Sequence, residues 1–229
     1  MTASQDMIAT LTAMGDSTKA AEMAAYHKTA RVFLGVPAAA LDELARGLRS
    51  DLDVAERCAL AQELWQGDVH EGGILAAKLL TQARIRPDDA RVWDIISDWA
   101  QGFDSWALAD AASIAGAKRL QAVPARLDEV ESWTQSANMW TRRAALVMTL
   151  PWARLPHPKA EDLAVRDRVL GWAEGYVPDR DRFIQKAIGW WLRELSRRDP
   201  DRVVQFLDGP GAALTKGAKT EAMRLIAAQ

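Results

Sequence analysis

The chain has 229 residues, of which 49% are hydrophobic and 26% are charged, and its formal net charge is −2. This composition is typical of a globular protein with a sizeable buried core. It excludes a chain that is basic throughout, so any surface that binds nucleic acid must be local.

Cysteine content and hydropathy indicate the compartment. The single cysteine, Cys58, excludes an intramolecular disulfide framework and fits a reducing compartment. Its apolar helical surroundings predict a small buried side chain rather than a nucleophile. No run approaches the roughly 18 apolar residues of a membrane span, and no basic stretch precedes the first apolar residues. We therefore expect a cytoplasmic protein that has no membrane attachment.

Apolar residues recur at helical spacing almost throughout the chain, and Gly and Pro mark the breaks. Gly35, followed by Pro37, is expected to stop the second helix, and Pro151 to end the ninth. Asp179 after Pro178 is expected to cap the eleventh. The expected helices cover residues 5–14, 18–34, 37–48, 53–65, 68–83, 87–100, 105–120, 124–134, 138–150, 160–175, 179–198, 201–207 and 214–228.

Short loops between these helices favour antiparallel neighbours. The helices pair at a spacing of about 35–45 residues, the range of HEAT-type repeats. We therefore expect an all-α fold, an α-α superhelix of HEAT-like repeats that forms one domain over residues 1–229 and has a concave face. A compact helical bundle without repeats is the alternative. Gly72 and Gly73 lie in the middle of an expected helix, so close packing or a short break is expected there.

Ten tryptophans stand out against two tyrosines and four phenylalanines. Most are expected to fill the helical core, including Trp65, Trp93, Trp133 and Trp172. Trp190 and Trp191 are adjacent and point about 100° apart on a helix. We expect them to be unequally buried, with one available to line a groove.

Two stretches place cations where an anion would bind. Lys186, Trp190, Arg193 and Arg197 form one helical stripe, which is either a solvated face or a surface that holds a phosphodiester beside an indole. Arg142 and Arg143 lie in the first turns of another expected helix and oppose its dipole. They either bind an anion there or form salt bridges with neighbouring helices.

Trp106 and Asp110, in the stretch FDSWALAD, lie four residues apart and so share one face of a helix. A carboxylate among alanines is either a capping or hydrogen-bonding group or a site residue. Asp104, just before Ser105, is expected to be the N-cap.

No metal or cofactor is expected. The three histidines, His27, His70 and His157, are scattered in the sequence, and no Cys/His cluster accompanies them. Phosphate-binding loops and nucleophile elbows are likewise not found among the motifs of the chain.

Five stretches resemble the DNA alkylation repair family of HEAT-like helical glycosylases, the AlkD type, and occur in the family's order. The most specific is FIQKAIGWWLRE. The five are MAAYHKTARVFLGVP (23–37), ELWQGDVHEGGILAAKLL (63–80), FDSWALAD (103–110), NMWTRRAALV (138–147) and FIQKAIGWWLRELSRRDP (183–200).

This resemblance implies an α-solenoid that cradles duplex DNA in its concave groove and removes cationic N3- and N7-alkylated purines without a deep base pocket. It implies that the catalytic Trp-x-x-x-Asp pair is Trp106 and Asp110, that Arg143 is the catalytic arginine and that Trp190 is the second sugar-contacting tryptophan. A competing alignment uses Trp93 and Asp98, but there the carboxylate falls five residues on, off the indole's face.

The excision reaction suits these residues. As the base leaves, the sugar becomes an oxocarbenium ion, which a carboxylate and the faces of indole rings can stabilise. The further DNA-binding candidates are Arg142, Lys186, Arg193 and Lys28. The expected partner is duplex DNA that contains alkylated purines, bound by a monomer. Two alternatives stay open: a protein that binds damaged or branched DNA without excision, and a HEAT-like scaffold for a protein partner.

Overall fold

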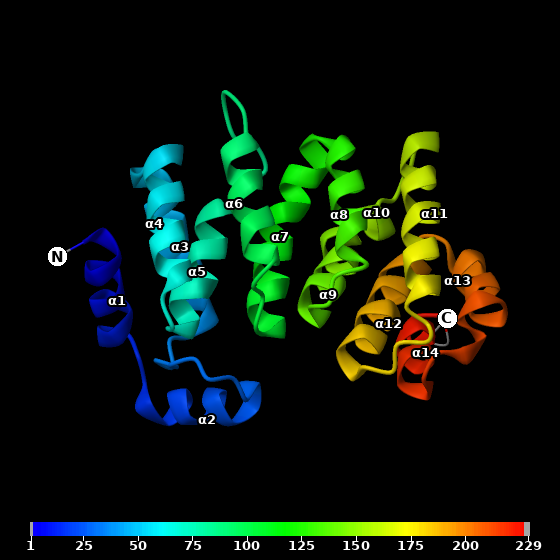
Figure 1. Cartoon of the computed structure of the whole chain (residues 1–229), viewed down its shortest axis with the longest axis horizontal. Helices are drawn as coiled ribbons and strands as arrows, with labels where there is room; N and C mark the ends of the chain where they lie inside the picture. Colours follow the sequence, from blue (N-terminus) through cyan, green and yellow to red (C-terminus); the bar gives the residue numbers. More distant parts are fainter. Residues whose placement is uncertain (1, 227–229) are drawn as a thin grey trace. The chain divides into compact units, whose positions relative to one another are not determined.

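The computed structural model describes residues 2–226, and within that range the fold is entirely helical apart from one isolated bridge between Val32 and Val69 (Figure 1). The helices group into two compact units, Met1–Ala122 and Val123–Gln229. The prediction of a single domain over residues 1–229 stays a prediction. No helix among the described residues has the length and apolar character that crossing a membrane requires.

The first unit contains α1 (Ala3–Ala13), α2 (Ser17–His27), α3 (Ala38–Asp51), α4 (Val54–Gln66), α5 (His70–Leu80), α6 (Ala90–Ala100) and α7 (Trp106–Ala122). The second contains η1 (Pro124–Arg126), α8 (Leu127–Trp133), α9 (Met139–Met148), α10 (Leu150–Arg154), α11 (Ala160–Gly175), α12 (Arg182–Ser196), α13 (Pro200–Asp208), η2 (Pro210–Ala213) and α14 (Lys216–Met223). The helix expected over residues 214–228 is thus shorter, and its residues 227 and 228 lie outside the described part of the chain.

Helix α5 is the centre of the first unit and packs against α3, α4 and α7. Close packing or a short helix break was expected at Gly72 and Gly73, and the structure shows close packing. A Cβ on Gly73 would lie 2.8 Å from Cδ2 of Leu108 in α7, and one on Gly72 would lie 3.2 Å from Cδ1 of Ile8 in α1. The helix continues through both glycines, and a Cβ at either position would require the side chain of Leu108 or Ile8 to shift.

The helix expected over residues 18–34 is wrong in its second half. It ends at His27, and Lys28 adopts a left-handed conformation with φ 54°. The chain then runs in an extended course, in which the N–H of Val32 donates to the carbonyl of Asp68 (3.0 Å) and the N–H of His70 donates to the carbonyl of Val32 (2.8 Å). Local apolar spacing continued through this segment, but its backbone hydrogen bonds are made with the start of α5.

A buried carboxylate holds the end of this segment, which we call the α2–α3 linker (residues 28–37). Glu71 of α5 is fully buried. It accepts hydrogen bonds from the backbone N–H groups of Leu34 (3.0 Å), Gly35 (2.7 Å) and Val36 (3.3 Å). Gly35 has φ 79°, and a Cβ there would lie 2.1 Å from the carbonyl oxygen of Asp16. Glycine is therefore required where the linker passes the start of α2.

Helix α12 has the same central place in the second unit, where it packs against α9, α10, α13 and α14. Its buried face includes Ile184, Ile188 and Trp191. Pro151 does not end a helix as expected. Instead α9 ends at Met148, and the proline lies in the first turn of α10, where its missing N–H needs no partner.

Gly189 of α12 allows α14 to pack closely, because a Cβ there would lie 2.9 Å from the carbonyl oxygen and 3.2 Å from Cα of Ala218. Since these are backbone atoms, the Gly189→Ala variant must move α14. We expect the free energy of unfolding to fall by about 1–3 kcal/mol, as measured by urea denaturation.

The matched control is Gly47→Ala in α3, where a Cβ would have no neighbour within 4 Å. Because alanine favours the helix, this variant should be more stable by about 0.5–1 kcal/mol. Equal stability changes for the two variants would contradict the packing described for α12 and α14.

Candidate functional site

The first turns of α7 present an indole and a carboxylate on the same side of the helix. Trp106 and Asp110 are both half-buried, whereas the residues between them, Ala107, Leu108 and Ala109, are buried against the unit. The N–H of Ala109 donates to the carbonyl of Ser105 at 3.1 Å, so the helical turn is formed from its first residue. The spacing in the sequence therefore becomes one accessible turn that carries both groups.

An aromatic stack covers Trp106 on the side of α2 and α5. The stack consists of Tyr26, His27, Phe33, His70 and Trp106. His27 lies parallel to Trp106, with ring centroids 5.0 Å apart and 16° between the planes. Tyr26 approaches the same indole edge-on at 6.0 Å. His70 lies 4.7 Å from His27 and 4.6 Å from Phe33.

The histidines of this stack are neutral at pH 7. Burial lowers the pKa of His70 to about 4, and the neighbouring His27 acts in the same direction. Burial also lowers the pKa of His27, and the charge of Glu71 opposes this only in part. Nδ1 of each ring is buried without a hydrogen-bond partner in the described part of the chain. Uncharged imidazoles suit such a site, since a protonated Nδ1 would lack a hydrogen-bond acceptor there.

Sequence reasoning missed this pair, since it treated the histidines as scattered. His27 and His70 are 43 positions apart (70 − 27) and no motif joins them. Asp104, expected to be the N-cap of α7, lies 2.7 Å from Nε of Arg31 and forms an ion pair that ties α7 to the α2–α3 linker. The same arginine donates to the carbonyl of Gly67 at 3.0 Å.

In the second unit, the two arginines at the start of α9 are used differently. Arg143 is only 6% exposed, and its Nη1 donates to the carbonyl of Phe183 at 2.8 Å. Arg142 is half-buried, pairs with Asp179 at 3.0 Å and donates to the carbonyl of Ser136 at 2.8 Å. Of the two interpretations left open, the salt bridge to a neighbouring element is the one seen for Arg142.

The adjacent tryptophans of α12 are unequally buried, as expected. Trp191 is 1% exposed, and its Nε1 donates to Oγ1 of Thr149 at 3.1 Å. Trp190 is half-buried at the surface of the same helix. Of the core tryptophans expected, Trp93, Trp133 and Trp172 are buried, whereas Trp65 is half-buried and stacks on Trp99 with ring centroids 4.0 Å apart.

The remaining DNA-binding candidates differ in the exposure of their side chains and in whether a carboxylate already pairs with them. Lys186 is exposed, with Nζ 5.8 Å from the ring centroid of Phe183. Lys28 is exposed at the left-handed end of α2. Arg193 is 17% exposed and is bound by the carboxylates of Glu194 and Glu221. Because two negative charges already compensate it, Arg193 is the weakest of these candidates.

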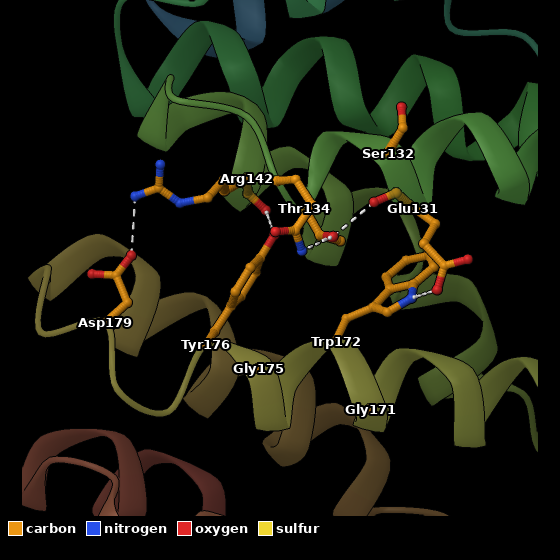
Figure 2. Close-up of a pocket in the computed structure, with 10 residues that line it drawn as sticks. Glu131, Ser132, Thr134, Arg142, Gly171, Trp172, Gly175, Tyr176 and Asp179 are labelled. Carbon is orange, nitrogen blue, oxygen red and sulfur yellow. Dashed lines mark hydrogen bonds and ion pairs between the residues drawn. The ribbon is translucent and has the colours of Figure 1, made fainter.

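A pocket of about 460 Å³ opens between α8, α9 and α11 of the second unit (Figure 2). Its charges are already paired, because Glu131 forms an ion pair with Arg168 and Arg142 forms one with Asp179. Glu131 also accepts a hydrogen bond from Nε1 of Trp172 at 2.6 Å. Tyr176 donates to the carbonyl of Arg142 at 3.0 Å. The pocket therefore offers no uncompensated charge to an anion, and neither Trp106 nor Asp110 lines it.

A second pocket, of about 350 Å³, lies in the first unit beside α2 and is almost entirely apolar. His70 and Glu71 lie at its border, and Met23, Leu41 and Ile74 contribute to its walls. Residues 2–226 contain no group of three or more His, Cys, Asp or Glu side chains placed to hold a metal ion.

Comparison with known proteins assigns the fold. A family model described as "DNA alkylation repair enzyme" matches residues 7–226. A structure described as a predicted DNA alkylation repair enzyme from Enterococcus faecalis is similar with a TM-score of 0.79 and 22% identity, over 94% of this chain and 98% of that one. AlkD2 from Streptococcus mutans is similar with a TM-score of 0.59 and 19% identity, over 81% and 86%. A search of curated proteins found no match.

These likenesses confirm the predicted fold class, an all-α fold of the AlkD-type helical-repeat kind. Because the sequence identities are only 22% and 19%, the similarity to these two structures shows the fold but not the activity. The assignments of Asp110, Trp106, Arg143 and Trp190 as site residues, and of a concave DNA-binding groove, stay predictions.

The different burial of the adjacent tryptophans can be measured. Trp191→Phe removes the hydrogen bond to Thr149 and leaves a gap in the core. We expect it to lower the free energy of unfolding by roughly 2–4 kcal/mol in a denaturant titration. The half-buried Trp190, changed to Phe as the matched control, should cost less than about 1 kcal/mol. A larger loss at Trp190 than at Trp191 would reverse the assignment of the core indole.

Proposed function

Because the chain belongs to the family of DNA alkylation repair enzymes, we propose that it is a DNA glycosylase that excises cationic N3- and N7-alkylated purines from duplex DNA. The observation that carries the proposal is the accessible turn of α7, where the half-buried indole of Trp106 precedes the half-buried carboxylate of Asp110 by four residues. The reaction belongs to base excision repair, and its substrate brings the positive charge that weakens the bond.

The bond that breaks joins C1′ of the deoxyribose to the purine nitrogen. Its electron pair moves into the purine, which leaves as a neutral alkylated base because it carried a positive charge before. The sugar becomes an oxocarbenium ion, and a water oxygen then forms the new bond to C1′. That water loses one proton, and the products are the free base and an abasic site. Because the leaving group is already cationic, no strong general acid is needed.

Asp110 is proposed to act on the sugar rather than on the base. A carboxylate beside C1′ would stabilise the positive charge that develops there, and Asp110 is also proposed to orient the attacking water and accept its proton. The indole of Trp106, one turn before it, attracts the same cation through its π-electrons. Trp190, half-buried on α12, is proposed as the second indole that contacts the sugar.

Binding to DNA is proposed to depend on a few local cations, because the net charge of the chain is −2. Arg143 is proposed to hold a backbone phosphate, and its Nη1 also donates to the carbonyl of Phe183. Lys186 and Lys28, both exposed, are proposed to contribute sequence-independent contacts, and Arg142 and Arg193 weaker ones.

A protein that binds damaged or branched DNA without excision is the second candidate. The observation that favours it is the engagement of Arg142 and Arg143 by other parts of the second unit. The two candidates differ in one outcome, because only a glycosylase releases a free base.

Excision can be tested with Asp110→Asn. We expect wild-type protein to release 7-methylguanine from methylated duplex DNA at low salt, and the variant to release it at least about 100-fold more slowly. DNA binding by Asp110→Asn should persist, since the variant does not remove a cation. The readout is the rate constant for base release with enzyme in excess over DNA.

The matched control is Asp98→Asn, an exposed carboxylate that follows the buried Trp93 in α6. Its rate should equal that of wild type. An Asp110→Asn variant as fast as wild type would refute the proposed role of the carboxylate. DNA binding without release by the wild type would instead identify the second candidate.

The proposed phosphate contacts predict the salt dependence of binding. Lys186→Ala should weaken binding to methylated and unmethylated duplexes alike, because a phosphate contact carries no sequence information. The slope of log Kd against log salt concentration should fall by about one, as measured by fluorescence anisotropy. An unchanged slope would remove Lys186 from the DNA-binding surface.

A further inference from the structure

We infer that His27 is a positioning residue for the proposed excision reaction: its neutral imidazole supports the rear face of Trp106 and thereby sets which face of the indole meets the sugar. This inference rests on the proposed function and adds a residue and a pH dependence to it. It comes from the aromatic stack, which neither the family match nor the structural likenesses describe.

The geometry limits how Trp106 can receive a sugar. Its indole lies nearly parallel to His27 with centroids 5.0 Å apart, so that face is covered by an offset-stacked ring. Tyr26 stands edge-on to the same indole at 6.0 Å and is 72% exposed. A sugar therefore has to approach Trp106 on the face opposite His27.

His27 also contacts two buried rings besides Trp106. His70 lies 4.7 Å from it, Phe33 lies 5.4 Å from it at 21°, and both of these rings are buried. Helix α2, by contrast, has no buried residue along its length. His27 and Tyr26 are thus the rings through which α2 contacts Trp106 of α7, and His27 is the one that covers a face of the indole.

The charge on His27 matters because the proposed reaction develops a cation at the sugar. The charged and titratable groups around the stack are Glu71 and His70 on α5, Arg31 on the linker, Asp104 and Asp110 beside and on α7, and Tyr26 and Lys28 next to His27 itself. Glu71 is already occupied by three backbone N–H groups. A proton on His27 would therefore add a positive charge behind the indole that no dedicated partner compensates.

The sign of the pH effect follows from these facts. Burial lowers the pKa of His27 below 6.5, so the ring is neutral at pH 7 and gains its proton only as the pH falls. The imidazolium then opposes the oxocarbenium ion through the indole between them. We expect the rate of excision to fall on acidification, with a midpoint below 6.5, and to be constant from there to about pH 8.

The test compares the rate of 7-methylguanine release between pH 5 and 8 for wild type, His27→Ala and His27→Phe, with enzyme in excess so that binding is complete. His27→Ala should lose about two- to tenfold at pH 7.5, the range expected for one aromatic contact. His27→Phe should rescue most of this loss, because phenylalanine restores the ring but carries no proton. Its rate should fall less steeply in acid, because residue 27 then gains no charge.

His157→Ala is the control for the removal of a histidine, because His157 is exposed in the loop before α11 and belongs to the second unit. Its pH profile should match that of wild type. Two results would overturn the inference: a His27→Ala rate equal to wild type, or a His27→Phe profile with the same acid limb as wild type.

A second measurement separates this inference from the proposed function. Protein labelled with 5-fluorotryptophan gives a ¹⁹F resonance for Trp106, identified by its loss in Trp106→Phe. The resonance should shift with pH in the wild type and stay still in His27→Phe. Absence of that shift in the wild type overturns the stack itself. A clear shift in a protein that releases no base would leave the stack standing, but would refute both the glycosylase and the role of His27 in it.

Discussion

The buried carboxylate of Glu71 is the interaction on which the first unit depends. A fully buried charge is costly unless hydrogen bonds compensate it, and here three successive backbone N–H groups of the α2–α3 linker do so. The linker in turn holds α2, which contributes no buried residue of its own. His27 at the end of α2 then reaches Trp106. A central helix, a linker and the candidate site are therefore connected by one carboxylate and a short series of rings.

Most helices could be predicted from the sequence, because their ends are determined locally. Thr2, Asp16 and Asp53 cap the helices that follow them. The failures have different causes. Asp179 was expected to cap the eleventh helix, but Asp181 caps α12 instead, because its carboxylate accepts a hydrogen bond from the N–H of Phe183. Residues 28–34 have helical spacing, but their backbone groups bind α5 instead. Pro151 was expected to stop a helix, whereas Pro in the first turn of a helix is equally favourable.

The candidate site was predictable to the extent that it is local. A spacing of four residues is sufficient to place Trp106 and Asp110 on one accessible turn, and adjacency is sufficient to separate Trp190 from Trp191. The environment of each group was not predictable, because it depends on residues far apart in the sequence. The contact of His27 with His70, and the compensation of Arg193 by Glu221, arise only when the helices pack.

Recognition of the linker by Glu71 uses main-chain atoms, and this has a consequence for how the protein tolerates sequence change. The N–H groups of residues 34 and 36 are present in every amino acid except proline, so the side chains at these positions are free to vary as far as this contact is concerned. Only Gly35 is restricted, by its backbone conformation. In related proteins that use the same contact, we expect a glycine at the position of Gly35 and an acidic residue at the position of Glu71. The sequence between these two positions should show little similarity.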